Sequence, residues 1–258
     1  MLFFGTPQFS VPTLTALAHD GYQLRVITRE DKPAGRGLAL TPPPVKAAAQ
    51  RLGIPFEQPG RLDSAFLQRV AAWRPDLAVL AAYGKLIKPD LLALPLHGFV
   101  NVHPSLLPRH RGASPVAATI SSGDTETGVT LMCLDEGLDT GPILAQEKVP
   151  LRGDETCGEL TAHLASLGAR LLVQTLPAFL RGDIQPVPQN AGQATMTRLL
   201  TKDSGKIDWS RPAHEIERMI RAYDPWPSAW TVMKKKRVRI LNASVDGVSQ
   251  SEKGTIVA

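Results

Sequence analysis

Cysteine and long hydrophobic runs are both scarce in this chain of 258 residues, and each shortage argues against a class of protein. The two cysteines, Cys133 and Cys157, are far apart and lack metal-ligand neighbours, which disfavours a disulfide framework or a zinc site. The longest apolar runs have only the length of a strand, so we expect no membrane span. No basic and apolar leader opens the sequence, and a cytoplasmic location is the expected default.

Charge is distributed unevenly along the chain. The hydrophobic fraction of 43% and the charged fraction of 21% are typical of a globular protein. Of the 29 Lys and Arg residues, 11 lie after residue 199, against 7 of the 24 acidic residues. The run Lys-Lys-Lys-Arg-Val-Arg at 234–239 is the centre of this basic part. Such a run is often only a solvated turn, and its functional interpretation is a polyanionic partner.

Short apolar segments alternate with helical patterns in the first hundred residues, which predicts an α/β fold. This alternation indicates a doubly wound, mostly parallel sheet with helices on both faces, whose ligands bind beyond the carboxyl ends of the strands. The expected strands cover 2–5, 23–28, 77–82 and 99–103, and the expected helices cover 11–19, 45–52 and 64–73.

The rest of the chain predicts the end of this sheet and then a second, smaller unit. Leucines at helical spacing indicate one long helix before a proline-rich segment. We therefore expect a first domain over 1–189, a linker over 190–202 and a second unit over 203–258. The further elements expected are strands at 127–132 and 143–149, a helix over 159–180, a helix near 213–222, and strands near 230–234 and 237–242.

An amide and an imidazole lie two residues apart at the end of a predicted strand. Side chains at i and i+2 of a strand point the same way, so Asn101 and His103 can address one ligand atom together. Pro104 then ends the strand. Downstream, Asp139 in a glycine-flanked turn offers a carboxylate. Taken singly, each of these residues is more often a capping or structural residue than a catalyst.

Several motifs in a fixed order resemble the folate-dependent formyltransferases. They are Asn101, His103 and Asp139 with Ser105-Leu-Leu-Pro-Arg109 between them, together with Gly5-Thr-Pro-Gln-Phe9, Lys32-Pro-Ala-Gly-Arg-Gly37, Arg111-Gly-Ala-Ser-Pro115 and Tyr223-Asp-Pro-Trp-Pro227. The resemblance runs from residue 1 to about residue 245. Within the family the chain is most similar to the members that act on methionyl-initiator-tRNA.

The resemblance implies a Rossmann-like formyltransferase fold and the transfer of a formyl group from 10-formyltetrahydrofolate to the amino group of methionyl-initiator-tRNA, without a metal. His103 and Asn101 would stabilise the charge on the formyl oxygen, and Asp139 would tune His103 and accept the amine proton. The family's folate site carries over to Ser105, Leu106, Leu107 and Pro108. Arg109 and Arg111 are either contacts for anionic ligand groups or solvated side chains.

The resemblance also implies how the tRNA is bound. A long Gly/Pro/Arg-rich loop over residues 29–42 would meet the acceptor end, with Arg36 as the contact, and Lys234, Lys235 and Lys236 would bind phosphates. Trp226 is expected to be a buried indole. The family has residues before Met1 and about half of a small OB-like barrel after Ala258, so the sequence is expected to be truncated at both ends. A monomer is expected.

Three alternatives remain open from the sequence. A formyltransferase could act on another amine, such as a ribonucleotide or an amino sugar nucleotide. A truncated remnant could bind RNA without catalysis. A nucleotide-dependent dehydrogenase is disfavoured, because the first strand leads into Gly5-Thr-Pro-Gln-Phe9 and not into a Gly-x-Gly-x-x-Gly turn.

Overall fold

A seven-stranded sheet in the order β5-β2-β1-β6-β7-β9-β10 organises the computed structural model, which describes residues 1–34 and 39–245. The first five strands in this order, β5, β2, β1, β6 and β7, run parallel to one another. Strands β9 and β10 continue the sheet, each antiparallel to the strand before it. This confirms the predicted mostly parallel sheet. The strands are β1 (Leu2–Gly5), β2 (Arg25–Ile27), β5 (Phe56–Glu57), β6 (Ala78–Ala81), β7 (Phe99–His103), β9 (Glu126–Cys133) and β10 (Ile143–Pro150).

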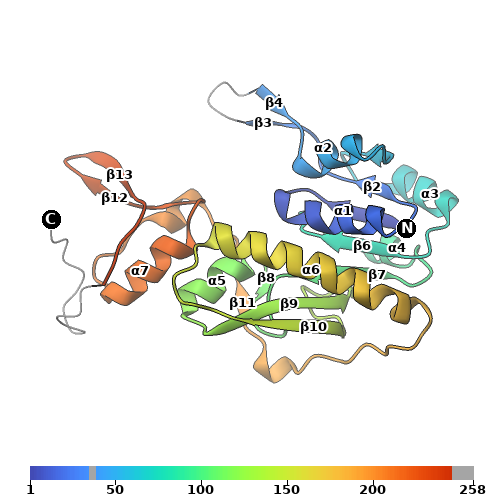
Figure 1. Ribbon diagram of the computed structural model, residues 1–258. Coiled ribbons are helices and arrows are strands. Elements are labelled where there is room, and N and C mark those ends of the chain that lie inside the picture. Colours follow the sequence, from blue (N-terminus) through green and yellow to red (C-terminus); the bar gives the residue numbers. More distant parts are fainter. Residues whose placement is uncertain (35–38, 246–258) are drawn as a thin grey trace.

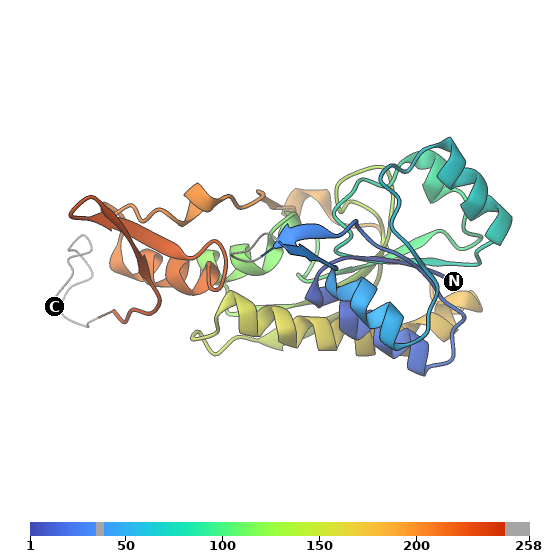
Figure 2. The same cartoon turned by 90° about the horizontal axis from the view of Figure 1, so that it is seen from above.

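Helices cover both faces of the sheet (Figures 1 and 2). One face packs against α1, α2 and α6 in the larger hydrophobic cluster, and the other packs against α3 and α4 in the smaller one. All the strands and helices predicted up to residue 180 are present, with ends shifted by a few residues, whereas α4 and α5 were not predicted. The helices are α1 (Val11–His19), α2 (Pro44–Arg51), α3 (Ser64–Trp73), α4 (Pro89–Leu92), α5 (Pro115–Ser122) and α6 (Cys157–Leu180).

The long helix α6 packs against one face of the sheet, where its Gly168 lies over Val102 near the end of β7. A capping box starts it, because the Thr156 hydroxyl accepts from the Glu159 amide while the Glu159 carboxylate accepts from Thr156. At Gly168 the helix lies so close that a Cβ atom would come within 2.6 Å of Val102. Val100 and Val102 therefore face α6, and strand alternation turns Asn101 and His103 to the opposite face.

The segment expected as a loop over residues 29–42 contains a small antiparallel hairpin. Strands β3 (Lys32–Ala34) and β4 (Ala39–Thr41) pair with each other, so the prediction of an irregular loop was wrong for these residues. At the hairpin's base, Lys46 forms an ion pair of 2.7 Å with Asp31. Arg36, the predicted tRNA contact, lies outside the described residues.

The C-terminal unit has its own small core. Helix α7 (Ala213–Ala222) packs beneath the hairpin of β12 (Ala229–Met233) and β13 (Lys236–Ile240), as predicted, and buries Ile207, Ile216 and Ile220. The unit extends from the rest of the molecule at the end opposite α3 (Figure 1). The hairpin is the part of the expected barrel that the described residues contain.

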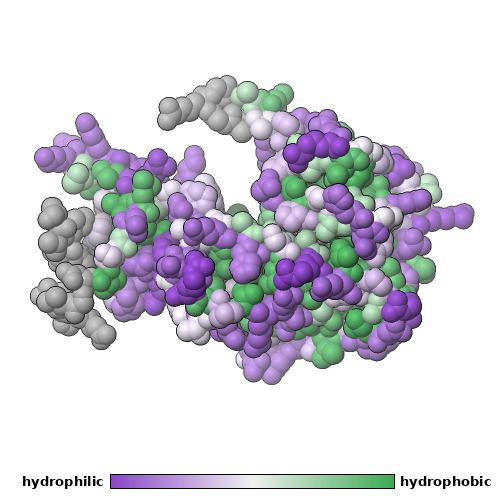
Figure 3. Space-filling view, viewed as in Figure 1, coloured by the Kyte–Doolittle hydropathy of each residue, from purple (hydrophilic) through white to green (hydrophobic). Residues whose placement is uncertain are grey.

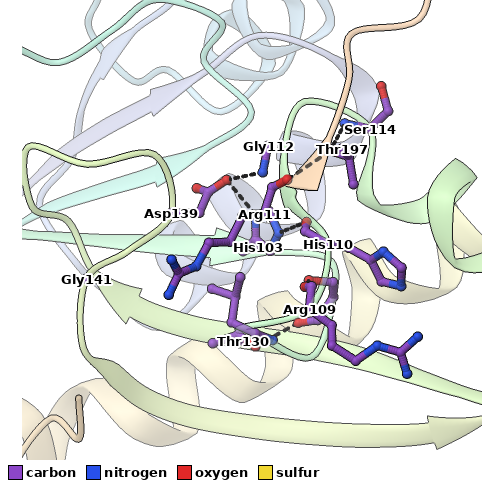
Figure 4. Close-up of polar contacts among 12 residues, drawn as sticks. His103, Arg109, His110, Arg111, Gly112, Ser114, Thr130, Asp139, Gly141 and Thr197 are labelled. Atoms are coloured by element: carbon purple, nitrogen blue, oxygen red, sulfur yellow. Dashed lines mark hydrogen bonds and ion pairs between the residues drawn. The ribbon is translucent and has the colours of Figure 1, made fainter. Parts of the chain in front are cut away.

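One expectation about the C-terminal half needs correction. Trp226 has 52% of its surface exposed, so it is not the buried indole that its stiff, proline-flanked turn suggested. The segment expected as a linker, over 190–202, contains β11 (Met196–Thr197), which pairs in parallel with β8 (Arg111–Gly112), next to His103 in the close-up view (Figure 4).

None of the helices in the described residues is both long enough and apolar enough to cross a membrane.

Candidate active site

Asn101 and His103 lie buried at the carboxyl end of β7, with 6% and 4% of their surface exposed. Across the sheet, Asn101 pairs with Met132 and His103 with Thr130 of β9. The Asn101 side-chain amide has no hydrogen bond to any other group of the described residues. Among the described residues, the enclosed side-chain atoms without a partner do not include this amide, so it reaches the open space beside the strand end, where a ligand can contact it.

The loop after β7 is held by Thr130. The Thr130 hydroxyl donates to the Ser105 carbonyl at 2.7 Å and accepts from the Leu107 amide at 3.0 Å. The Ser105 hydroxyl donates to the Arg109 carbonyl at 2.7 Å, and Gln146 donates to the Leu107 carbonyl at 2.9 Å. The polar groups of Ser105 and Leu107 are therefore used within the protein.

Leu106 and Pro108 lie on the outer side of this loop. They line a cavity of about 410 Å³ together with Gln146 and Lys148 of β10. The four residues predicted to bind folate thus differ in surroundings, since Leu106, Leu107 and Pro108 all border this cavity while Ser105 is fully buried and does not line it. Their binding role stays a prediction.

Arg109 and His110 are anchored away from His103. The Asp124 carboxylate accepts from Arg109 Nη2 at 2.6 Å and forms a contact of 2.7 Å with the His110 ring. Both side chains point away from Asp139 in the close-up (Figure 4). This geometry turns His110 so that its backbone carbonyl, and not its imidazole, faces His103.

The His103 imidazole lies between two acceptors. Its Nε2 is 3.1 Å from the His110 carbonyl oxygen, which can only accept, so Nε2 carries a proton. Its Nδ1 is 3.7 Å from Asp139 Oδ2, too long for a direct hydrogen bond. Nδ1 is therefore the ring nitrogen left to exchange a proton with a ligand.

Burial dominates the acid–base behaviour of His103. Desolvation lowers the pKa of the imidazole below its ordinary value of 6.5, although the Asp139 carboxylate and the His110 carbonyl both act to raise it. The neutral form, protonated on Nε2, is therefore the main form of His103 near neutral pH.

Asp139 is brought to His103 by the turn between β9 and β10. Its carboxylate oxygen Oδ2 accepts a hydrogen bond of 2.7 Å from the Gly112 amide (Figure 4). Its backbone has φ 54°, in the left-handed region that few residues other than glycine adopt. The structure thus brings together all three residues predicted as catalytic, from positions 38 residues apart.

The supporting residues of this site were not predicted. Segment 189–197 lies against the loop 108–114, where Thr195 and Thr197 form hydrogen bonds with its backbone and Gln189 binds Arg111. Arg111 and Gly112 belong to the motif Arg111-Gly-Ala-Ser-Pro115. No local sequence pattern identifies Gln189 or the two threonines. Their role depends on contacts between residues 78 to 86 positions apart in the sequence.

The three predicted tRNA-binding lysines lie at the tip of the C-terminal hairpin. Lys234 and Lys235 form its turn with φ values of 48° and 63°, and Lys236 begins β13. All three are exposed. The guanidinium of Arg237 lies 4.0 Å from the centre of the Trp230 ring. At this end of the molecule hydrophilic residues are mixed with hydrophobic ones (Figure 3), which include the exposed Val232 and Met233 of β12.

Comparison with solved structures defines the class of fold. An N-formyltransferase from Helicobacter canadensis, in complex with folinic acid and dTDP-3-aminofucose, superposes with a TM-score of 0.73 at 19% identity, over 93% of this chain and 85% of that one. HypX from Aquifex aeolicus in complex with tetrahydrofolic acid superposes with a TM-score of 0.67 at 17% identity, over 100% of this chain and 40% of that one. The fold is that of the formyltransferases.

Sequence comparison gives the family. The family model described as formyl transferase matches residues 1–176, and the model of the formyl transferase C-terminal domain matches residues 199–258. The chain belongs to the formyl transferase family. The methionyl-tRNA formyltransferases of Roseiflexus sp. (strain RS-1) and Myxococcus xanthus are 50% and 45% identical to it, over 100% of this chain and 81% and 83% of theirs.

Proposed function

We propose that this protein transfers the formyl group of 10-formyltetrahydrofolate to the amino group of methionyl-initiator-tRNA. The observation that carries the proposal is the 45–50% identity, along the whole chain, to proteins named methionyl-tRNA formyltransferase. The Asn101–His103–Asp139 cluster at the end of β7 supports it, because formyl transfer requires a donor for the developing oxyanion and an acceptor for the amine proton.

Asn101 is the proposed donor to the formyl oxygen. Negative charge grows on that oxygen as the amine attacks the formyl carbon, and a fixed N–H donor in a buried site stabilises this charge more than the ground state. The Asn101 amide suits this role because it is only 6% exposed and binds no other group among the described residues.

His103 is the proposed carrier of the amine proton. During transfer the amine nitrogen bonds to the formyl carbon and loses a proton, which must reach the departing folate nitrogen. In the neutral tautomer, Nδ1 can accept that proton, and Asp139 at 3.7 Å favours the resulting imidazolium. The geometry therefore favours a proton acceptor over the oxyanion donor that the sequence suggested for His103.

The C-terminal unit is the proposed tRNA-binding part. Lys234, Lys235 and Lys236 at the hairpin tip can neutralise phosphates, and their exposure leaves them available to the polyanion. We retain the division into a catalytic domain over 1–189, a linker over 190–202 and a C-terminal domain over 203–258. We further propose that the protein acts as a monomer in the cytoplasm.

The test is formyl transfer from 10-formyltetrahydrofolate to methionyl-initiator-tRNA, with uncharged tRNA as control and mass spectrometry of the released amino acid as readout. Formyl-methionine is the expected product, at a rate that depends on the tRNA. Parallel reactions with an amino sugar nucleotide and an amino ribonucleotide cover the other acceptors. Formylation of one of these in place of the tRNA would overturn the proposal.

A further inference from the structure

The side-chain amide of Gln189 is fully used in hydrogen bonds. Its oxygen accepts from Arg111 Nε at 3.1 Å and from Arg111 Nη2 at 2.7 Å. Its nitrogen donates to the Asp139 carbonyl at 2.9 Å and to the Gly141 carbonyl at 2.7 Å. The donors on one side and the acceptors on the other fix the orientation of this amide, because a side-chain amide supplies both an acceptor and two donors.

These bonds join the two segments that hold the Asp139 carboxylate. The Gly112 amide, beside Arg111 in β8, donates to the carboxylate itself. Gln189 holds the backbone of the turn that carries it. Asp139 has φ 54°, a left-handed conformation that aspartate tolerates better than most residues other than glycine, and these contacts hold its turn in that conformation.

We propose that Gln189 is a positioning residue for formyl transfer, which fastens the Asp139 turn to β8 and so keeps the Asp139 carboxylate opposite His103 Nδ1. The proposal rests on the proposed roles of His103 and Asp139. Gln189 lies between the segments matched by the two family models, so the connection between them forms part of the active site.

Release of the Asp139 turn has a measurable electrostatic consequence. The groups that face His103 are the Asp139 carboxylate from the β9–β10 turn and His110 from the loop after β7, while Arg111 of β8 is held by Gln189. Asp139 raises the pKa of His103 against the effect of burial. A carboxylate that moves away therefore lets the pKa of His103 fall further.

Kinetics of two variants test the proposal. Gln189→Met keeps the size of the side chain and removes its hydrogen bonds, and we expect kcat to fall by roughly 10- to 100-fold, because small displacements of reacting groups cost this much. KM for both substrates should change less than about twofold, since the proposed substrate-binding residues are unaltered. Gln185→Ala is the control, because Gln185 is exposed four residues earlier and its amide donates only to the Gly182 carbonyl.

Gln189→Glu separates positioning of Asp139 from simple pairing with Arg111. A glutamate keeps the acceptor for Arg111, which supports folding, but turns an oxygen toward the Asp139 and Gly141 carbonyls. We expect its kcat to be as low as that of Gln189→Met. Full activity in Gln189→Glu would overturn the proposal, because Gln189 would then serve only as the partner of Arg111.

An NMR titration of His103 in the protein without substrates gives a readout that does not depend on the acceptor. The midpoint should move to lower pH in Gln189→Met, in the same direction as in Asp139→Asn, and stay unchanged in Gln185→Ala. An unchanged midpoint in a folded Gln189→Met protein would contradict the positioning role. Lack of methionyl-tRNA formylation by the unmodified protein would refute only the proposed function.

Discussion

The backbone amide of Gly112 donates a hydrogen bond of 2.7 Å to the carboxylate of Asp139. The same glycine has φ 109°, and a Cβ atom there would lie 2.6 Å from the Thr197 carbonyl oxygen. One residue thus satisfies two requirements, because it orients the carboxylate and lets the β11 strand approach the active-site loop.

Gly112→Ala should damage activity and stability together. The backbone must move to relieve the close approach to Thr197, and the Asp139 hydrogen bond moves with it. We expect a loss of roughly 1–3 kcal/mol in the free energy of unfolding and a fall in kcat of at least about tenfold. Gly153→Ala is the matched control, since its φ of 93° imposes similar strain but nothing lies within 4 Å of the added Cβ. Urea unfolding and formyl-transfer kinetics measure the two effects, and equal kcat values in the two variants would contradict the account.

Asn101→Leu should lower kcat while leaving the fold intact. Leucine has a similar size and no donor for the formyl oxygen, so the loss should resemble that of a removed oxyanion donor, about 100- to 1,000-fold. Folate affinity should change little, because the hydrogen bond strengthens only as charge develops. Single-turnover formyl transfer and equilibrium folate binding measure these quantities. A variant that binds folate poorly but retains kcat would assign Asn101 to binding.

The pH dependence of kcat/KM should report neutral His103 as the active form, because this ratio reports the groups of the enzyme without substrate. Activity is expected to fall as the pH drops through the pKa of His103, which burial places below 6.5. In Asp139→Asn the raising effect of the carboxylate is absent, so this acidic limb should move to still lower pH. Values of kcat/KM from about pH 5 to pH 9 test both points. A kcat/KM that rises as the pH falls would show that protonated His103 is the active form.

Removal of the hairpin lysines should weaken tRNA binding without affecting formyl transfer. In Lys234→Asn and Lys235→Asn the new residue tolerates the left-handed turn conformation, so charge is the main change. The slope of log affinity against log salt should fall by about 0.7 to 0.9 for each phosphate that the protein no longer neutralises. Arg74→Asn is the control, because Arg74 is also basic, exposed and left-handed, with φ 44° at the end of α3. Equal salt slopes in all variants would remove the hairpin from the interface.

Local sequence patterns predicted the strand that carries Asn101 and His103, but they failed for the β3–β4 hairpin and for the burial of Trp226. The apolar strand of residues 99–103 identified β7 and the shared direction of Asn101 and His103, since side-chain alternation is a property of the strand itself. The hairpin β3–β4 was missed because proline and glycine disguise its short strands. The burial of Trp226 was predicted wrongly, because a stiff turn fixes the backbone but not what covers the indole.

The amino-acid sequence was enough to infer the alternation of strands and helices and the family. It also selected Asn101, His103 and Asp139 as the catalytic candidates. These depend on local periodicity and on motifs of residues close in the chain. The folded structure was needed to establish which nitrogen of His103 faces the His110 carbonyl, and that Gln189, Thr195 and Thr197 hold the loop 108–114 and the Asp139 turn. Hydrogen bonds between distant segments leave no periodic signal, because each partner needs only one suitable atom at one place in space.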